Sequence, residues 1–108
     1  PKTNSALMKK IMETGLVISE YPINEEPKKY HFPERNRIIS GLSRGVVVVE
    51  ADIKSGSLIT AKYAYEQNRD VFALPGNITS RVSVGANQLI SDGATAILGA
   101  ETQVRTML

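Results

Sequence analysis

The segment Val46-Val47-Val48-Val49-Glu50 is the clearest strand in the sequence. A continuous β-branched run indicates a strand buried on both faces, as in the centre of a parallel sheet. Helical patterns lie on either side of it, at 33–43 and 58–67, and a further short strand is expected at 71–74. Strands that alternate with helices are typical of a parallel α/β sheet.

The alternation extends toward both ends of the chain. Residues 4–14 are expected to form a helix, because their apolar side chains fall on one stripe and Gly15 follows as a C-cap. Strands are expected at 16–20 and 95–98, and a helix at 84–92. Four parallel strands with intervening helices resemble one half of a doubly wound sheet. Since the chain begins without Met, we expect an N-terminal partner half to precede it.

Composition bounds the possible functions. At 108 residues the chain suits one domain or part of one. Cysteine is absent, which excludes disulfides, cysteine nucleophiles and cysteine-based zinc sites and fits a reducing cytoplasm. No apolar run approaches 18 residues, so no membrane span is expected. The net charge of +2 is too small to indicate a nucleic-acid partner by itself.

The segment Lys28-Lys29-Tyr30-His31-Phe32-Pro33-Glu34-Arg35-Asn36-Arg37 combines cations with rings. Lysine and arginine attract phosphate, while exposed rings stack on unpaired bases, so the composition suits single-stranded nucleic acid. The start of a helix adds N–H donors for an anion. The alternative is structural: Arg35 could pair with Glu50 or Asp52, and Arg37 could lie on a solvated face with Ser40 and Arg44.

Two glycine turns offer further candidates. Ser55-Gly56-Ser57 enters a helix and could cradle a phosphate, or it could be a tight turn in which Gly56 relieves strain and Ser57 caps. Pro75-Gly76 follows a strand at the sheet edge where ligands of open α/β folds bind, although such a pair is usually only a turn.

The sequence contains few of the residues and motifs that catalysis requires. His31 is the single histidine, and no nucleophile elbow, dinucleotide fingerprint, P-loop or metal-ligand spacing is present. We therefore expect no enzymatic activity, no cofactor and no metal.

Several ordered motifs together resemble the DNA-processing protein A (DprA/Smf) family. They are Gly15-Leu-Val-Ile-Ser-Glu-Tyr-Pro22, Phe32-Pro-Glu-Arg-Asn-Arg-Ile-Ile-Ser-Gly-Leu-Ser43, Val47-Val-Val-Glu-Ala51, Ser55-Gly-Ser-Leu-Ile-Thr-Ala61, Asn68-Arg-Asp-Val-Phe-Ala-Leu-Pro-Gly76 and Gly85-Ala-Asn-Gln-Leu-Ile-Ser-Asp-Gly-Ala94. The resemblance implies that residues 1–108 are the C-terminal part of a Rossmann-like domain. It also implies a cytoplasmic protein that binds single-stranded DNA, assists loading of the recombinase RecA in natural transformation, and forms a homodimer.

The resemblance assigns roles to particular residues. Lys29 would contact the DNA backbone and Phe32 a base or sugar. The family signature at the same pocket includes Arg35, Asn36 and Arg37, the first two of which would brace the pocket rather than touch DNA. The floor of the pocket would be formed by Ser55, Gly56 and Ser57. The dimer surface would lie on the helix that carries Asn87 and Ile90.

Two rival interpretations remain. One is an enzyme of a related Rossmann-like family that binds nucleotides or cleaves their N-glycosidic bonds. Here Pro75-Gly76 is followed by Asn77 in place of the second glycine typical of such enzymes. The other is a scaffold whose only partner is the recombinase or a second copy of itself.

Overall fold

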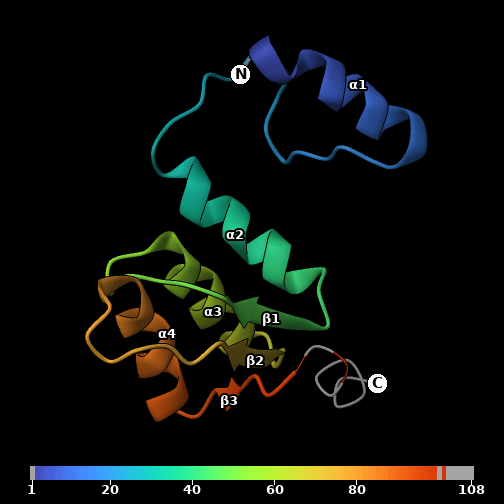
Figure 1. Cartoon of the computed structure of the whole chain (residues 1–108). Helices are drawn as coiled ribbons and strands as arrows, with labels where there is room; N and C mark the ends of the chain where they lie inside the picture. The colour runs from blue at the N-terminus through green and yellow to red at the C-terminus, as the bar shows by residue number, and fades with distance from the viewer. Residues whose placement is uncertain (1, 100, 102–108) are drawn as a thin grey trace.

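The computed structural model describes residues 2–99 and 101 of the chain. Its elements in chain order (Figure 1) are the 3-10 turn η1 (Lys2–Asn4), α1 (Ser5–Thr14), α2 (His31–Gly41), β1 (Gly45–Val48), α3 (Gly56–Glu66), β2 (Asp70–Ala73), α4 (Arg81–Ser91) and β3 (Thr95–Ala96). A helix needs about 20 residues to cross a bilayer. None in this part of the chain is long and apolar enough to do so.

The three strands form one parallel sheet in the order β1-β2-β3. The register pairs Val46 with Val71 and Phe72 with Thr95. The sheet is covered by α3 and α4, while α2 packs on α3 (Figure 1). The expected α/β class with a parallel sheet and flanking helices is therefore confirmed.

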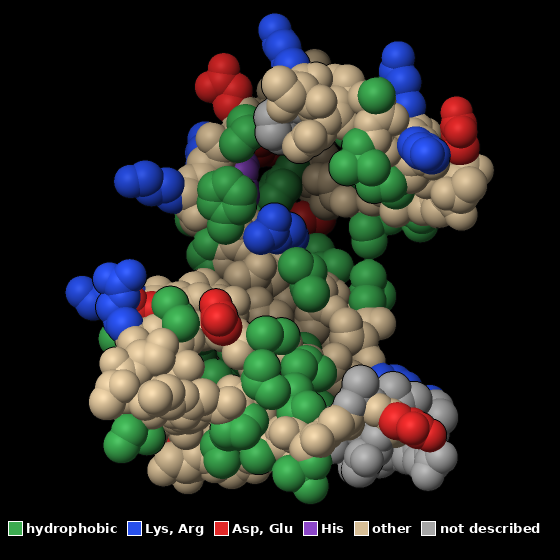
Figure 2. Space-filling model, viewed as in Figure 1, with side chains coloured by type: hydrophobic (Ala, Val, Ile, Leu, Met, Phe, Trp, Pro, Cys, Tyr) green, Lys and Arg blue, Asp and Glu red, His purple; other side chains and the backbone are tan. Residues whose placement is uncertain are grey.

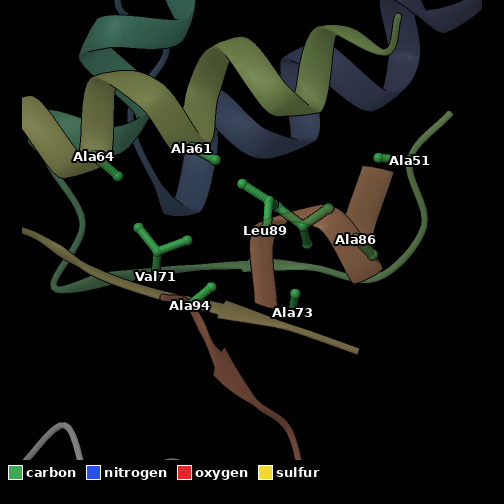
Figure 3. Close-up of a cluster of buried hydrophobic side chains, with 9 residues drawn as sticks. Ala51, Ala61, Ala64, Val71, Ala73, Ala86, Leu89 and Ala94 are labelled. Carbon is green, nitrogen blue, oxygen red and sulfur yellow. The ribbon is translucent and has the colours of Figure 1, made fainter. Parts of the chain in front are cut away.

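Small side chains build the core between the sheet and its two helices. Six of the nine residues in the main buried cluster are alanine; the cluster consists of Val48, Ala51, Ala61, Ala64, Val71, Ala73, Ala86, Leu89 and Ala94. Figure 3 shows Ala61 and Ala64 on α3 pointing toward Leu89 and Val71. Alanine at these positions lets the helix backbones approach the sheet closely, and protein interiors at native density tolerate little added volume there.

The prediction of a fourth strand at residues 16–20 was wrong. Residues 16–20 make no pairing within the described sheet, and Leu16 is 80% exposed. A strand is stable only when a neighbour satisfies its backbone groups. The end of this segment instead contacts α2 through an ion pair between Glu20 and Arg37. This contact attaches the end of the segment to α2.

The prediction that the valine run forms a central strand, buried on both faces, was also wrong. In the described sheet β1 is an edge strand, and only Val48 in it is buried. Val47 and Val49 are substantially exposed, since alternate side chains project to opposite faces and these two share the face opposite buried Val48. The β-branched run predicted a strand correctly but did not identify its neighbours.

Helix starts differ from the sequence predictions by one to three residues. Helix α2 begins at His31, and Pro33 still lies in its first turn. Helix α3 begins at Gly56, so the cap is Ser55, whose Oγ accepts the N–H of Ser57 at 3.2 Å. The interpretation of Ser57 as the cap was wrong. The interpretation that Gly56 relieves strain was also wrong, because Gly56 has no positive φ and a Cβ built on it would meet no atom within 4 Å.

Candidate nucleic-acid interface

The start of α2 presents a cation and a ring to solvent. Lys29 is exposed, and no acidic side chain in residues 2–99 and 101 forms an ion pair with it. Phe32 is 55% exposed, although large apolar rings are usually buried. Figure 2 shows Lys and Arg side chains over the upper part of the molecule, next to exposed hydrophobic ones. An unpaired ammonium three residues before an uncovered ring suits a ligand that carries both phosphate and base.

A series of contacts connects Phe32 to the start of α3. The guanidinium carbon of Arg35 lies 5.5 Å from the centroid of the Phe32 ring, within cation–π range. Arg35 Nη2 donates to Asn36 Oδ1 at 3.3 Å, and Asn36 Nδ2 donates to the Gly56 carbonyl at 3.5 Å. Asn36 is buried, whereas Arg35 is exposed. The amide of Asn36 thus fixes α2 to α3 and also orients Arg35.

The turn at Ser55–Ser57 offers backbone donors at the N-terminus of α3. The Ser57 N–H is satisfied by the Ser55 hydroxyl, while the N–H of Gly56 has no partner within its own helix. A Cβ built on Gly56 would meet no atom within 4 Å, so the space beside it is open. The positive end of the helix dipole favours an anion in this space.

The structure therefore joins most of the predicted site residues, although not all. Phe32, Arg35, Asn36 and the Ser55–Ser57 turn form one connected series. Lys29 precedes that series at the helix start and makes no hydrogen bond to the turn. Arg37 lies apart from it, since its guanidinium is paired with Glu20. The proposed pairing of Arg35 with Glu50 or Asp52 was wrong, because Asp52 pairs with Arg81 at 3.4 Å.

The alternative of a solvated face with Arg37, Ser40 and Arg44 is wrong for Ser40, although Arg37 and Arg44 are exposed. Ser40 is fully buried, and its hydroxyl bonds to Gln67 Oε1 at 2.6 Å. Gln67 Nε2 in turn donates to the Arg37 carbonyl at 2.9 Å. This contact fixes the second half of α2 against the end of α3, so the helix start that carries Phe32 is held on a rigid support.

A cleft of about 690 Å³ lies beside Phe32 and Arg35, between α2 and the connection at residues 18–27. Its lining is mostly apolar, with Ile23 and Leu42 among the contributing side chains. The connection is attached to α2 by the hydroxyl of Tyr21, which donates to Glu34. This hydrogen bond, assisted by burial, raises the pKa of Tyr21 to about 12. Tyr21 lines the cleft, and its contact with Glu34 escaped the sequence analysis, because no spacing pattern connects the two residues.

The other glycine turn is structural. The side chain of Asn87 on α4 accepts the N–H of Gly76 and donates to its carbonyl, both at 3.0 Å. Asn77 Oδ1 accepts from the backbone N–H and the hydroxyl of Thr79. Ile90 is partly buried against the core. Two residues predicted for a dimer surface thus have clear contacts within their own chain.

The described residues, 2–99 and 101, bring no three His, Cys, Asp or Glu side chains together as metal ligands. The polar chemistry at the start of α2 is instead that of cations, a ring and backbone donors.

Comparison with known families gives a match over the whole chain. The family described as DNA recombination-mediator protein A matches residues 1–108. The DNA processing protein DprA of Streptococcus pneumoniae is 53% identical over 97 residues, which cover 90% of this chain and 34% of that protein. Protein Smf of Escherichia coli is 50% identical over 98 residues, which cover 90% and 26%. The chain thus spans about a third or less of the length of these relatives.

Two solved structures share the fold. The X-ray structure of DprA from Streptococcus pneumoniae superposes with a TM-score of 0.88 at 48% identity, covering 97% of this chain and 37% of that one. DNA processing protein A from Helicobacter pylori, described as having a unique single-stranded DNA binding mode, superposes with a TM-score of 0.86 at 33% identity. That match covers 99% of this chain and 49% of the Helicobacter chain.

Proposed function

Because this chain belongs to the DprA/Smf family of DNA recombination-mediator protein A, we propose that its protein binds single-stranded DNA at the start of α2. The observation that carries the proposal is the contact series from the exposed Phe32 ring through Arg35 and Asn36 to Gly56. It connects a stacking surface to a helix N-terminus that is open to an anion. The single-stranded DNA binding described for the Helicobacter relative supports the same ligand.

In the proposal, DNA phosphates bind to a lysine ammonium and to backbone N–H donors. The ammonium of Lys29 contacts one phosphate, since no carboxylate in the described chain competes for it. The turn at Ser55–Ser57 forms the floor, where the Gly56 N–H and the α3 dipole attract another. Asn36 positions the floor, and Arg35 adds positive charge to the surrounding surface, whereas the charge of Arg37 is paired with Glu20.

Phe32 supplies selectivity for single strands. An unpaired base has a free face that can stack on the ring, whereas the bases of a duplex are already stacked on one another. Arg35 holds the ring from one side and leaves its exposed part to the ligand. Because stacking is possible for every base, we expect binding with little sequence preference.

The wider role is also part of the proposal. Bound single strands would be passed to the recombinase RecA in the cytoplasm during DNA uptake, by binding alone, without a catalytic step or a cofactor. We propose that the protein is a homodimer through α4, with Asn87 shaping the surface by holding Gly76 and Ile90 supporting it from beneath. Family membership is the support for these statements.

A titration of fluorescent oligo-dT, with a duplex of equal length as competitor, tests the DNA proposal on the whole protein. If about three phosphates are contacted, the log–log dependence of affinity on salt has a slope near −2, at roughly −0.7 per contact. Phe32→Ala should cost about 1–3 kcal/mol of binding free energy, as expected for loss of a stacked base. Lys29→Ala should weaken binding and flatten the slope.

Matched control variants separate loss of a specific DNA contact from a general loss of charge or apolar bulk. Lys9→Ala removes another exposed lysine, on α1, and should leave binding unchanged. Phe32→Leu keeps apolar bulk without a ring face and should behave like Phe32→Ala. A flat salt response, or equal affinity for single strands and duplex, would contradict the proposal. Release of free base from a nucleotide would favour the N-glycosidic enzyme instead.

A further inference from the structure

His31 is a buried polar residue that the proposed DNA contacts do not use. It is the first residue of α2 and is only 8% exposed, although its neighbours Tyr30 and Phe32 are exposed. Its ring stacks on Tyr21 with centroids 4.0 Å apart and meets the edge of Tyr30 at 4.7 Å. A buried imidazole packed between Tyr21 and Tyr30 needs an explanation that depends on its nitrogen atoms.

Two hydrogen bonds join His31 to a single residue, Lys28. The Lys28 N–H donates to Nδ1 of the imidazole at 3.1 Å, and the His31 N–H donates to the Lys28 carbonyl at 3.0 Å. The pair closes a ring around the two residues between them, Lys29 and Tyr30. The backbone from which the Lys29 side chain projects is therefore fixed at both ends by one histidine.

The first of these bonds determines the protonation of the ring. A backbone N–H can only donate, so Nδ1 must carry a lone pair and the proton of the neutral imidazole lies on Nε2. Nε2 is 3.3 Å from Glu25 Oε1, without the alignment of a hydrogen bond, and is buried. The histidine is thus an acceptor toward the Lys28–Lys29 turn, a role that a purely apolar ring of similar size cannot fill.

We propose that His31 is a positioning residue for single-stranded DNA: its Nδ1 holds the Lys28–His31 turn closed and so sets Lys29 in place beside Phe32. The inference rests on the proposed function, because it concerns the same binding surface. It assigns His31 no contact with DNA. Its effect passes through Lys29, whose ammonium makes no ion pair within the described chain and depends on the turn for its position.

Three substitutions distinguish the acceptor from the ring. His31→Phe keeps an aromatic ring and removes the acceptor. His31→Asn places an amide oxygen close to the position of Nδ1, so it can still accept the Lys28 N–H. His31→Gln carries the same amide one methylene further out, where the oxygen does not match Nδ1. The two amides are therefore a matched pair of equal polarity.

Oligo-dT titration of the whole protein at several salt concentrations is the test. We expect His31→Phe and His31→Gln to weaken binding several-fold and to reduce the magnitude of the salt slope by about 0.7, the value of one lost phosphate contact. His31→Asn should keep the wild-type affinity and slope. The double variant Lys29→Ala/His31→Phe should bind like Lys29→Ala alone, because both changes remove the same contact.

The outcomes separate the inference from the proposed function. If Lys29→Ala weakens binding while His31→Phe and His31→Gln bind like wild type, His31 has no positioning role. Equal losses in His31→Asn and His31→Phe would assign the effect to the ring and also overturn the inference. If Lys29→Ala itself binds like wild type, the proposed function fails and the role of His31 falls with it. Should thermal unfolding show that His31→Phe does not fold, the two amide variants decide the question.

Discussion

Residues 2–30 and residues 31–98 both carry regularly spaced apolar side chains, yet only the second region buries them. The described residues from 2 to 30 include no buried side chain, and α1 leaves its whole apolar stripe in solvent. The second region encloses the alanine-rich core between the sheet, α3 and α4 (Figure 3). Figure 1 shows α1 away from the sheet, on the other side of α2. An apolar stripe thus specifies a helix, but only a facing surface makes it part of a core.

The two regions also differ in the kind of contact that holds them. Residues 2–30 contact α2 mainly through exposed or half-exposed side chains: Glu20 pairs with Arg37, the hydroxyl of Tyr21 donates to Glu34, and the Tyr21 ring stacks on His31. Exposed ion pairs contribute about 0–1 kcal/mol each, whereas burying one large aliphatic side chain contributes about 1.5–3 kcal/mol. We therefore expect the stability of the chain to reside mainly in residues 31–98.

A pair of leucine truncations gives the largest contrast. Leu89 is 9% exposed and Leu7 is 56% exposed, while both lie in helices. Leu89→Ala should lower the free energy of unfolding by about 3 kcal/mol, since it leaves a cavity in the core. Leu7→Ala should change it by less than about 0.5 kcal/mol, as at other exposed positions.

Urea denaturation of the 108-residue chain, followed by circular dichroism, measures both values. A loss at Leu7 as large as the loss at Leu89 would show that α1 packs on something in solution. The comparison between the two regions would then no longer hold.

Two helical glycines, Gly85 within α4 and Gly56 at the start of α3, sharpen the comparison within residues 31–98. A Cβ on Gly85 would lie 2.6 Å from the Ala51 carbonyl oxygen, and the Gly85 N–H already donates to that oxygen at 2.7 Å. Gly85→Ala should therefore separate α4 from the loop after β1 and cost about 2 kcal/mol, as expected for overpacking. Gly56→Ala is the control, since a Cβ there meets open space. Equal thermal unfolding midpoints for the two variants would mean that α4 does not press on this loop.

The helices and strands could be predicted from the local pattern of apolar residues. The structure differs from the prediction where the pairing of a strand depends on residues far away in the sequence. Periodicity located four helices of the described chain and three of its strands within a few residues. It could not show that residues 16–20 lack a partner or that β1 lies at an edge, because a β-branched run has the same composition in either position. The cap at Ser55 was missed because both Ser55 and Ser57 are good capping residues, and only backbone geometry distinguishes them.

The candidate site also has a part that the sequence could predict and a part that it could not. Cations and rings at 28–37 could be recognised from composition, and the structure connects Phe32, Arg35 and Asn36 to the Gly56 turn. The contacts of Tyr21 with His31 and Glu34 could not be predicted, because they require the connection to fold back onto α2. Nothing in the spacing of these residues determines the path of the chain between them.

The smallest effect concerns the hydroxyl that fastens residues 2–30 to α2. The hydrogen bond to Glu34, then burial and the charge of Glu34, raise the pKa of Tyr21 from 10.0 to about 12. Because the folded pKa is the higher one, the stabilisation is fully present below pH 10 and is lost as pH rises from 10 to 12. Glu34→Gln should move the tyrosinate absorbance midpoint of Tyr21 back toward 10 and flatten the fall in stability over that interval. Tyr21→Phe supplies the difference spectrum that isolates this residue. An unchanged midpoint in Glu34→Gln would show that the connection does not rest on α2 through this bond.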